Sequence, residues 1–147
     1  MGARRKGREL AVQALYQIDA HGGSSAEMLR LFWEQADAGV RAKEFAAALV
    51  AGVGEQRERV DTLIAKASEH WRFERLSAVD LNVLRVATFE LLQRAAPTSV
   101  VLDEAIEIAR RFGTGESAVF VNGVLDQIAT QLGVKETAGE RSERDDG

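Results

Sequence analysis

The sequence has 147 residues, no cysteine and a formal net charge of −4. Its 46% hydrophobic and 29% charged residues are typical of a globular protein, and its length suggests one domain. The missing cysteine excludes disulfides and thiolate nucleophiles or metal ligands, and the net negative charge excludes a generally basic nucleic-acid coat. No apolar stretch reaches the roughly 20 residues of a membrane span. These features predict a soluble, cytoplasmic protein.

The charge is concentrated at the two ends of the chain. Residues 4–8 read RRKGR, with four positive charges in five positions. Residues 134–147 carry three positive and five negative charges and almost nothing to bury. We therefore expect a folded domain over residues 1–133 and a disordered charged tail over residues 134–147.

The first two predicted elements are helices. Apolar residues recur at helical spacing over residues 4–20, and Gly22 and Gly23 end this pattern. The basic residues of its first turn are unfavourable next to the positive end of the helix dipole. This local cost indicates that the arginines serve another purpose. Ser24 and Glu27 form a plausible capping box for a second helix, which contains Leu29, Phe32 and Trp33.

The middle of the chain continues the helical pattern. Residues 40–71 predict two helices or one kinked helix, interrupted by Gly52 and Gly54. A glycine costs about 1 kcal/mol against alanine in a helix, so close packing or a turn is expected there. Ser77 and Asp80 form a second capping box, which opens a strongly apolar helix to about Arg94.

Residues 99–117, SVVLDEAIEIARRFGTGES, raise the question of a nucleotide site. Their apolar residues follow a helical period, with Pro97 before the helix and Gly113 as its C-terminal cap. A phosphate loop needs a lysine after its second glycine, whereas Glu116 stands there. The segment is thus an amphipathic helix, and a last helix over residues 117–132 completes an all-α bundle of six or seven helices.

Other catalytic patterns are equally weak. His21 and His70 are the only histidines and have no recognisable ligand spacing. Neither a nucleophile elbow nor a dinucleotide fingerprint is present. No enzyme activity, cofactor or metal is expected. The arginines at positions 4, 5 and 8 suit phosphates or bases, although a basic terminus also simply aids solubility.

Three stretches together resemble the NusB family of bacterial transcription antitermination factors. They are RRKGRELAVQALYQID from Arg4, HWRFERLSAVDLNVLRVATFELL from His70, and APTSVVLDEAIEIARRFGTGESAVFVNGVLDQI from Ala96. The resemblance implies an all-helical fold of two packed subdomains. It implies binding to single-stranded boxA RNA of ribosomal RNA transcripts, together with the ribosomal protein NusE. The pair would join RNA polymerase and other Nus factors, without catalysis or cofactor.

The resemblance also implies roles for individual residues. Arg4, Arg5 and Arg8 match the family's RNA-binding segment, and Phe120 matches its aromatic residue at the RNA surface, although its spacing fits a core position equally well. Partner binding to NusE is implied for Tyr16 and Asp80. From spacing alone, Tyr16 also fits the core and Asp80 a helix cap. Gly123 is expected to allow close helix packing, and Val119 replaces a lysine that is frequent in the family.

Three alternatives stay open in the sequence. A NusB-like domain also begins certain ribosomal RNA cytosine methyltransferases, but such an enzyme needs a second domain and a nucleophilic cysteine. A helical protein-interaction module without an RNA role would not need Arg4, Arg5 or Arg8. A homodimer that hides the RNA surface is also compatible with the sequence.

Overall fold

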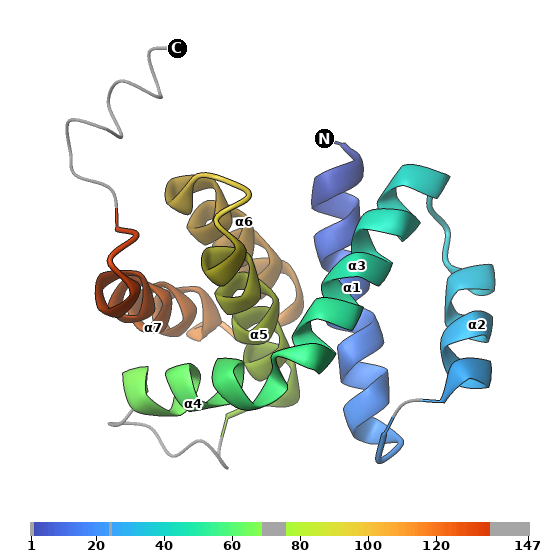
Figure 1. Ribbon diagram of the computed structural model, residues 1–147, viewed down its shortest axis with the longest axis horizontal. Coiled ribbons are helices and arrows are strands. Elements are labelled where there is room, and N and C mark those ends of the chain that lie inside the picture. The colour runs from blue at the N-terminus through green and yellow to red at the C-terminus, as the bar shows by residue number, and fades with distance from the viewer. Residues whose placement is uncertain (1, 24, 69–75, 136–147) are drawn as a thin grey trace.

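The computed structural model describes residues 2–23, 25–68 and 76–135, and over these residues it is all-α. It consists of seven helices and has no strand in the described ranges. The helices are α1 (Ala3–Ala20), α2 (Ala26–Gln35), α3 (Val40–Glu55), α4 (Arg57–Ala67), α5 (Ala78–Gln93), α6 (Thr98–Phe112) and α7 (Ser117–Leu132) (Figure 1). The predicted fold class is confirmed.

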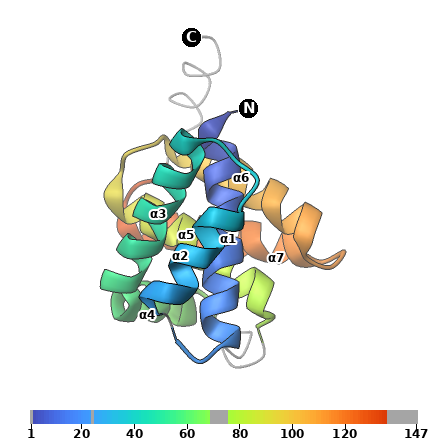
Figure 2. The same cartoon turned by 90° about the vertical axis from the view of Figure 1, so that its right-hand side faces the viewer.

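The helices form two packed subdomains, α1–α3 and α4–α7, which lie side by side (Figures 1 and 2). α1 packs against both α3 and α5, and α5 also packs against α6 and α7. One continuous core runs through both halves, with Leu15, Leu84 and Leu125 among its buried residues. α2 stands at the outer edge and has no fully buried residue. α1 and α5 therefore form the joint between the subdomains.

The helix boundaries follow capping chemistry. Ser77 Oγ accepts a 3.0 Å hydrogen bond from Asp80 N, which confirms the predicted start of α5. The N-cap of α2 is Ser25, whose Oγ accepts from Met28 N at 3.1 Å. Ser24, the cap expected from the sequence, lies outside the described residues, and the hydroxyl that caps α2 belongs to the next residue. Pro97 directly precedes α6, as predicted.

Close contacts explain some of the glycines. An alanine Cβ at Gly52 would lie 2.1 Å from Phe89 Cζ, so this glycine lets α3 approach α5. Gly113 ends α6 in an extended conformation, and a Cβ there would lie 2.3 Å from Ser117 Oγ. Gly123 is exposed and a Cβ would meet nothing within 4 Å. The packing role predicted for Gly123 was therefore wrong.

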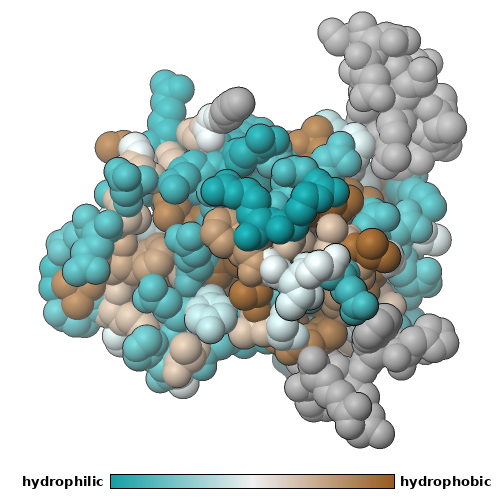
Figure 3. All heavy atoms as spheres, turned by 180° about the vertical axis from the view of Figure 1, so that it is seen from behind, coloured by the Kyte–Doolittle hydropathy of each residue, from teal (hydrophilic) through white to brown (hydrophobic). Residues whose placement is uncertain are grey.

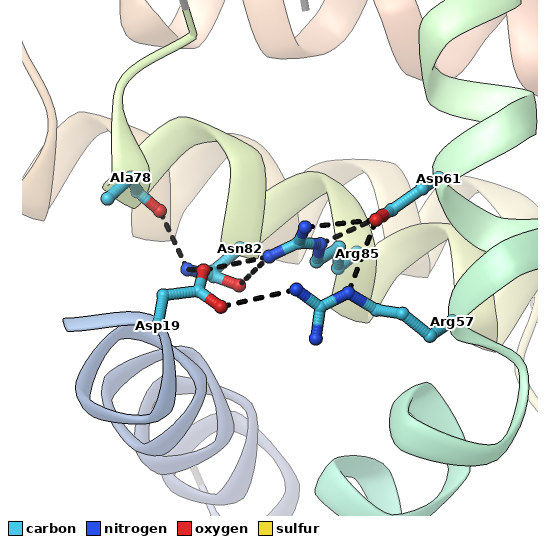
Figure 4. A network of polar contacts seen from close by, with 6 residues as sticks. All are labelled: Asp19, Arg57, Asp61, Ala78, Asn82 and Arg85. Carbon is cyan, nitrogen blue, oxygen red and sulfur yellow. Dashed lines mark hydrogen bonds and ion pairs between the residues drawn. The ribbon is translucent and has the colours of Figure 1, made fainter. Parts of the chain in front are cut away.

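A network of charged side chains connects α1, α4 and α5 (Figure 4). Arg85 Nη1 donates to Asp19 at 2.8 Å, and Arg85 Nε donates to Asp61 at 2.8 Å. Asn82 Nδ2 also donates to Asp19, and Arg57 bridges the two aspartates from the solvent side. Burial opposes the charge of Arg85, but hydrogen bonds and attraction from Asp61, then Asp19, raise its pKa overall. The network fixes the C-terminal end of α1 against the second subdomain.

Two further expectations concern the predicted tail, residues 134–147, and the absence of a membrane-spanning helix. Thr98 Oγ1 donates to the carbonyl of Val134 at 2.7 Å, and Lys135 pairs with Asp126, so these two residues lie against the fold. The rest of the predicted tail, residues 136–147, lies outside the described residues. Within the described part, none of the helices has the length and apolarity needed to cross a membrane.

Two substitutions in α3 test the packing role of Gly52. Gly52→Ala should destabilise the protein by about 1–3 kcal/mol, because the Phe89 ring has to move. Gly54→Ala is the matched control, since a Cβ at Gly54 meets nothing within 4 Å. It should stabilise the helix by up to about 1 kcal/mol. Urea unfolding measures both, and equal effects of the same sign would contradict the assignment.

Candidate nucleic-acid interface

The start of α1 is placed by its contact with α3. A Cβ at Gly7 would lie 2.7 Å from the ring of Phe45, so the glycine in RRKGR lets the two helices meet. Arg4 is exposed, and its guanidinium lies 5.8 Å from the centroid of the Phe45 ring. This cation–π contact holds the arginine above an aromatic surface while it faces solvent.

Arg8 lies inside the protein. Only 4% of the residue is exposed, and its Nε and Nη2 donate to the two carboxylate oxygens of Glu90 at 2.7 and 2.8 Å. Its guanidinium also lies 5.5 Å from the Phe45 ring centroid. This corrects the expectation that Arg8 shares a surface with Arg4 or Arg5. The buried pair joins α1 to α5, and we assign Arg8 a structural role.

Arg5 lies on the surface but is not unpaired. Its Nε and Nη2 donate to both carboxylate oxygens of Glu104 on α6, at 2.9 and 3.0 Å. About half of the Arg5 side chain is exposed, against 16% of the Glu104 side chain. The hydrogen bonds that Arg5 donates to Glu104, and then the negative charge of Glu104, raise the pKa of Arg5 above its ordinary value. The arginine is held in place with one side open to solvent.

Phe120 lies in the first turn of α7 and is half-buried. It packs against the core and also lines an open pocket of about 480 Å³. The neighbouring Val121 is fully buried, whereas Val119 is 78% exposed. Among the described residues the pocket is lined by Leu76, Ser77, Asp80, Thr114, Gly115, Glu116, Ser117, Val119 and Phe120. The surface and core interpretations of Phe120 thus both describe part of its environment.

The two residues expected at a protein partner lie on α1 and α5. Tyr16 is 44% exposed on α1. Asp80 lines the same pocket as Phe120, and its buried Oδ1 has no hydrogen-bond partner in the described structure. Its backbone N–H donates to Ser77, but this oxygen does not complete the capping box. Asp80 Oδ1 is thus a buried acceptor that no donor among the described residues satisfies.

The pocket and the basic start of α1 are separate features of the surface. Arg4 and Arg5 do not line the pocket that brings Phe120 and Asp80 together. No group of three or more metal-ligating residues gathers in the described ranges, and His70 lies outside them. Sequence reasoning missed Phe45 as the platform for Arg4, because its helical spacing identifies only a core face.

The role of Arg8 is tested by breaking its pair and then removing both partners. Arg8→Met should lower the free energy of unfolding by about 3–5 kcal/mol, because Glu90 is left charged and buried. The double variant Arg8→Met with Glu90→Leu should regain most of this loss, since both buried charges are gone. Chemical denaturation measures both proteins. An Arg8→Met variant as stable as the parent would refute the structural role.

Comparisons with known proteins place this geometry in a family. The model of the NusB family matches residues 5–130. The transcription antitermination protein NusB of Sorangium cellulosum is 46% identical over 90% of this chain and 96% of its own. That of Geobacter sulfurreducens is 48% identical over 90% of this chain and 97% of its own.

Solved structures agree with the sequence comparisons. NusB of T. maritima is 41% identical and has a TM-score of 0.78, over 87% of this chain and 91% of its own. A structure of the antitermination factors NusB and NusE in complex with double-stranded RNA contains a chain that is 26% identical, with a TM-score of 0.79. That match covers 88% of this chain and 97% of the other. The chain therefore belongs to the NusB family.

Proposed function

We propose that this protein is a transcription antitermination factor that binds single-stranded boxA RNA of ribosomal RNA transcripts together with the ribosomal protein NusE. The pair acts in the cytoplasm as part of an antitermination complex with RNA polymerase and other Nus factors. The observation that carries the proposal is the likeness to a NusB chain solved with NusE and RNA. Relatives that are 46–48% identical and are named antitermination proteins support it.

The geometry of the basic residues supports a role in RNA binding. Arg4 and Arg5 are exposed at the start of α1, and each is held by a neighbour, Phe45 for Arg4 and Glu104 for Arg5. A guanidinium that is already ordered loses less conformational freedom when it binds a phosphate. Sequence-specific recognition of RNA uses unpaired bases, which stack on aromatic rings. Phe120 offers part of such a ring at the edge of an open pocket.

Tyr16 and Asp80 support a protein partner. Tyr16 presents an aromatic ring with a polar tip, a type of residue that is enriched at interfaces. Asp80 lines the open pocket with an acidic side chain, whose negative charge suits a basic ribosomal protein. The acidic net charge of −4 would also speed association with such a partner. Catalysis and a cofactor form no part of the proposed role.

RNA binding by the protein alone should be weak and dependent on salt. Two neutralised phosphates, one each at Arg4 and Arg5, give a log–log salt slope of about −1.4 for a single strand. Arg8 adds nothing to this number because it is buried against Glu90. NusE is expected to strengthen the interaction by extending the surface.

The proposal is tested by fluorescence anisotropy of a labelled boxA RNA, with a scrambled RNA of equal length as control. The protein should prefer boxA, and NusE should increase both the affinity and the preference. Phe120→Ala should weaken binding by about 1–3 kcal/mol if the ring stacks on a base. Phe120→Tyr keeps a ring and should bind nearly as well as the parent.

A third variant separates stacking from packing at this position. Phe120→Leu keeps an apolar side chain against the core but has no ring. It should therefore bind RNA about as weakly as Phe120→Ala, while its melting temperature stays close to that of Phe120→Tyr. If Phe120→Ala has the RNA affinity of the parent protein but a lower melting temperature, Phe120 is a core residue and not an RNA contact. Equal binding of boxA and scrambled RNA in the presence of NusE would refute the proposed function.

A further inference from the structure

Two ion pairs of opposite polarity cross between α1 and α6. Arg5 on α1 pairs with Glu104 on α6, and Glu9 on α1 pairs with Arg111 on α6. In both pairs the arginine is about half exposed, at 49% and 58% of its side chain, while the carboxylate is mostly buried, at 16% and 8%. Each helix thus supplies one buried anion and one exposed cation to the same seam.

The burial of the carboxylates decides what these pairs can do. A carboxylate with little access to water needs its cationic partner, so Glu104 and Glu9 keep their arginines when a phosphate approaches. A guanidinium has five donors, and Glu104 uses the edge formed by Nε and Nη2 of Arg5. The opposite edge, which includes Nη1, still carries donors that can bind a second anion.

Arg111 is ordered by two contacts. Its Nη1 donates to Glu9, and its guanidinium lies 5.1 Å from the centroid of the half-exposed Phe112 ring. It also stands in the last turn of α6, where the helix dipole favours a cation. The sequence did not single out Arg111, because its partner Glu9 is 102 residues away along the chain.

The two pairs are close enough for one RNA strand to contact both. The pairs are one helical turn apart on α1, where Arg5 and Glu9 are separated by about 6 Å along the helix axis. They are two turns apart on α6, where Glu104 and Arg111 are separated by about 10 Å. α1 and α6 both lie on the side of the molecule that faces away from the viewer in Figure 1. Figure 3 shows that side, where the most hydrophilic residues gather in a cluster above the centre, next to apolar residues. This spacing is suited to neighbouring phosphates on a single strand.

We propose that Arg111 is a further RNA contact and that Arg5 and Arg111 bind neighbouring phosphates of one strand along the seam between α1 and α6. Glu104 and Glu9 are positioning residues that hold the two guanidinium groups with their free edges outward. The inference rests on the proposed RNA-binding function and adds to it a second basic element, outside the arginine-rich start of α1.

A neighbouring arginine provides a matched control. Arg110 is 60% exposed, but it pairs with Glu107 of its own helix, which is itself 48% exposed. Exposed pairs three residues apart on a helix are weak and are not fixed in one geometry. Arg110→Ala and Arg111→Ala remove the same charge from adjacent positions, so they differ in the proposed contact and not in net charge.

The first test measures RNA affinity of these two variants by anisotropy, using the protein without NusE. With Arg111 as a third phosphate contact, the salt slope of the parent protein becomes about −2.1 instead of −1.4. Arg111→Ala should return the slope to about −1.4 and weaken boxA binding about fivefold in 0.1 M salt. Arg110→Ala should change both quantities much less. Equal losses in the two variants would overturn the assignment of Arg111.

The second test uses the sign of a charge effect. Simple electrostatics predicts that loss of either Glu104 or Glu107 strengthens the binding of a polyanion. Because Glu104 positions Arg5, Glu104→Ala should instead weaken binding, whereas Glu107→Ala should strengthen it slightly. In an Arg5→Ala background, Glu104→Ala should no longer weaken binding. Tighter binding by Glu104→Ala would overturn the positioning role, and Glu104→Gln repeats the test if the alanine variant is poorly folded.

Failure of this inference can be told apart from failure of the proposed function. Suppose that Phe120→Ala weakens boxA binding, while Arg111→Ala and Arg110→Ala have the same RNA affinity. The protein then binds RNA, but the ion pairs between α1 and α6 take no part in the binding. If the parent protein does not distinguish boxA from scrambled RNA even with NusE, the proposed function fails as well. Melting temperatures of all variants show whether a loss of binding reflects a loss of structure.

Discussion

The buried ion pair between Arg8 and Glu90 is the constraint on which the placement of α1 depends. Both residues lose nearly all contact with water, so each charge must be satisfied by the other. The bidentate geometry is met only when α1 and α5, from different subdomains, are correctly placed in register. With α1 fixed there, Arg4 lies over Phe45 of α3, and Arg5 and Glu9 pair with Glu104 and Arg111 of α6.

The second end of α1 is held in the same way. Asp19 accepts hydrogen bonds from Arg85 and Asn82 of α5 and pairs with Arg57 (Figure 4). Charged contacts near both ends therefore tie one helix to the second subdomain, while apolar packing fills the space between. An interface made this way keeps the surface arginines in position without a large basic patch. The proposed RNA binding is therefore compatible with a net charge of −4.

The helices could be predicted because their signals are local. Apolar spacing identified each helix, and Ser77 and Gly52 were interpreted correctly from capping chemistry and helix propensity. The sequence does not show which residues become neighbours in three dimensions, and the packing role predicted for Gly123, which depends on such neighbours, was wrong. Gly123 gave no sign that it faces solvent, because a glycine without a side chain has no hydropathy pattern of its own.

The site residues show the same difference between local signals and contacts made by residues far apart in the sequence. The run RRKGR predicts a basic surface, but only the fold reveals that Glu90 takes Arg8 into the core. Glu90 is 82 residues from Arg8, and Glu104 is 99 residues from Arg5. No spacing rule along the sequence connects such residues. We therefore leave Arg8 out of the arginines proposed to bind RNA, and Arg111 of α6 is proposed in addition.

NMR can distinguish most directly between the buried Arg8 and the arginines proposed to bind RNA. The experiment follows the Nε–H signals of the arginines while boxA RNA is added. The Arg8 signal should be protected from solvent exchange and should hardly move, because its Nε–H is committed to Glu90. The signals of Arg4, Arg5 and Arg111 should shift with RNA, since these are the side chains proposed to contact the strand. An Arg8 signal that exchanges freely and shifts most on RNA addition would contradict the account, because Arg8 would then be a surface contact.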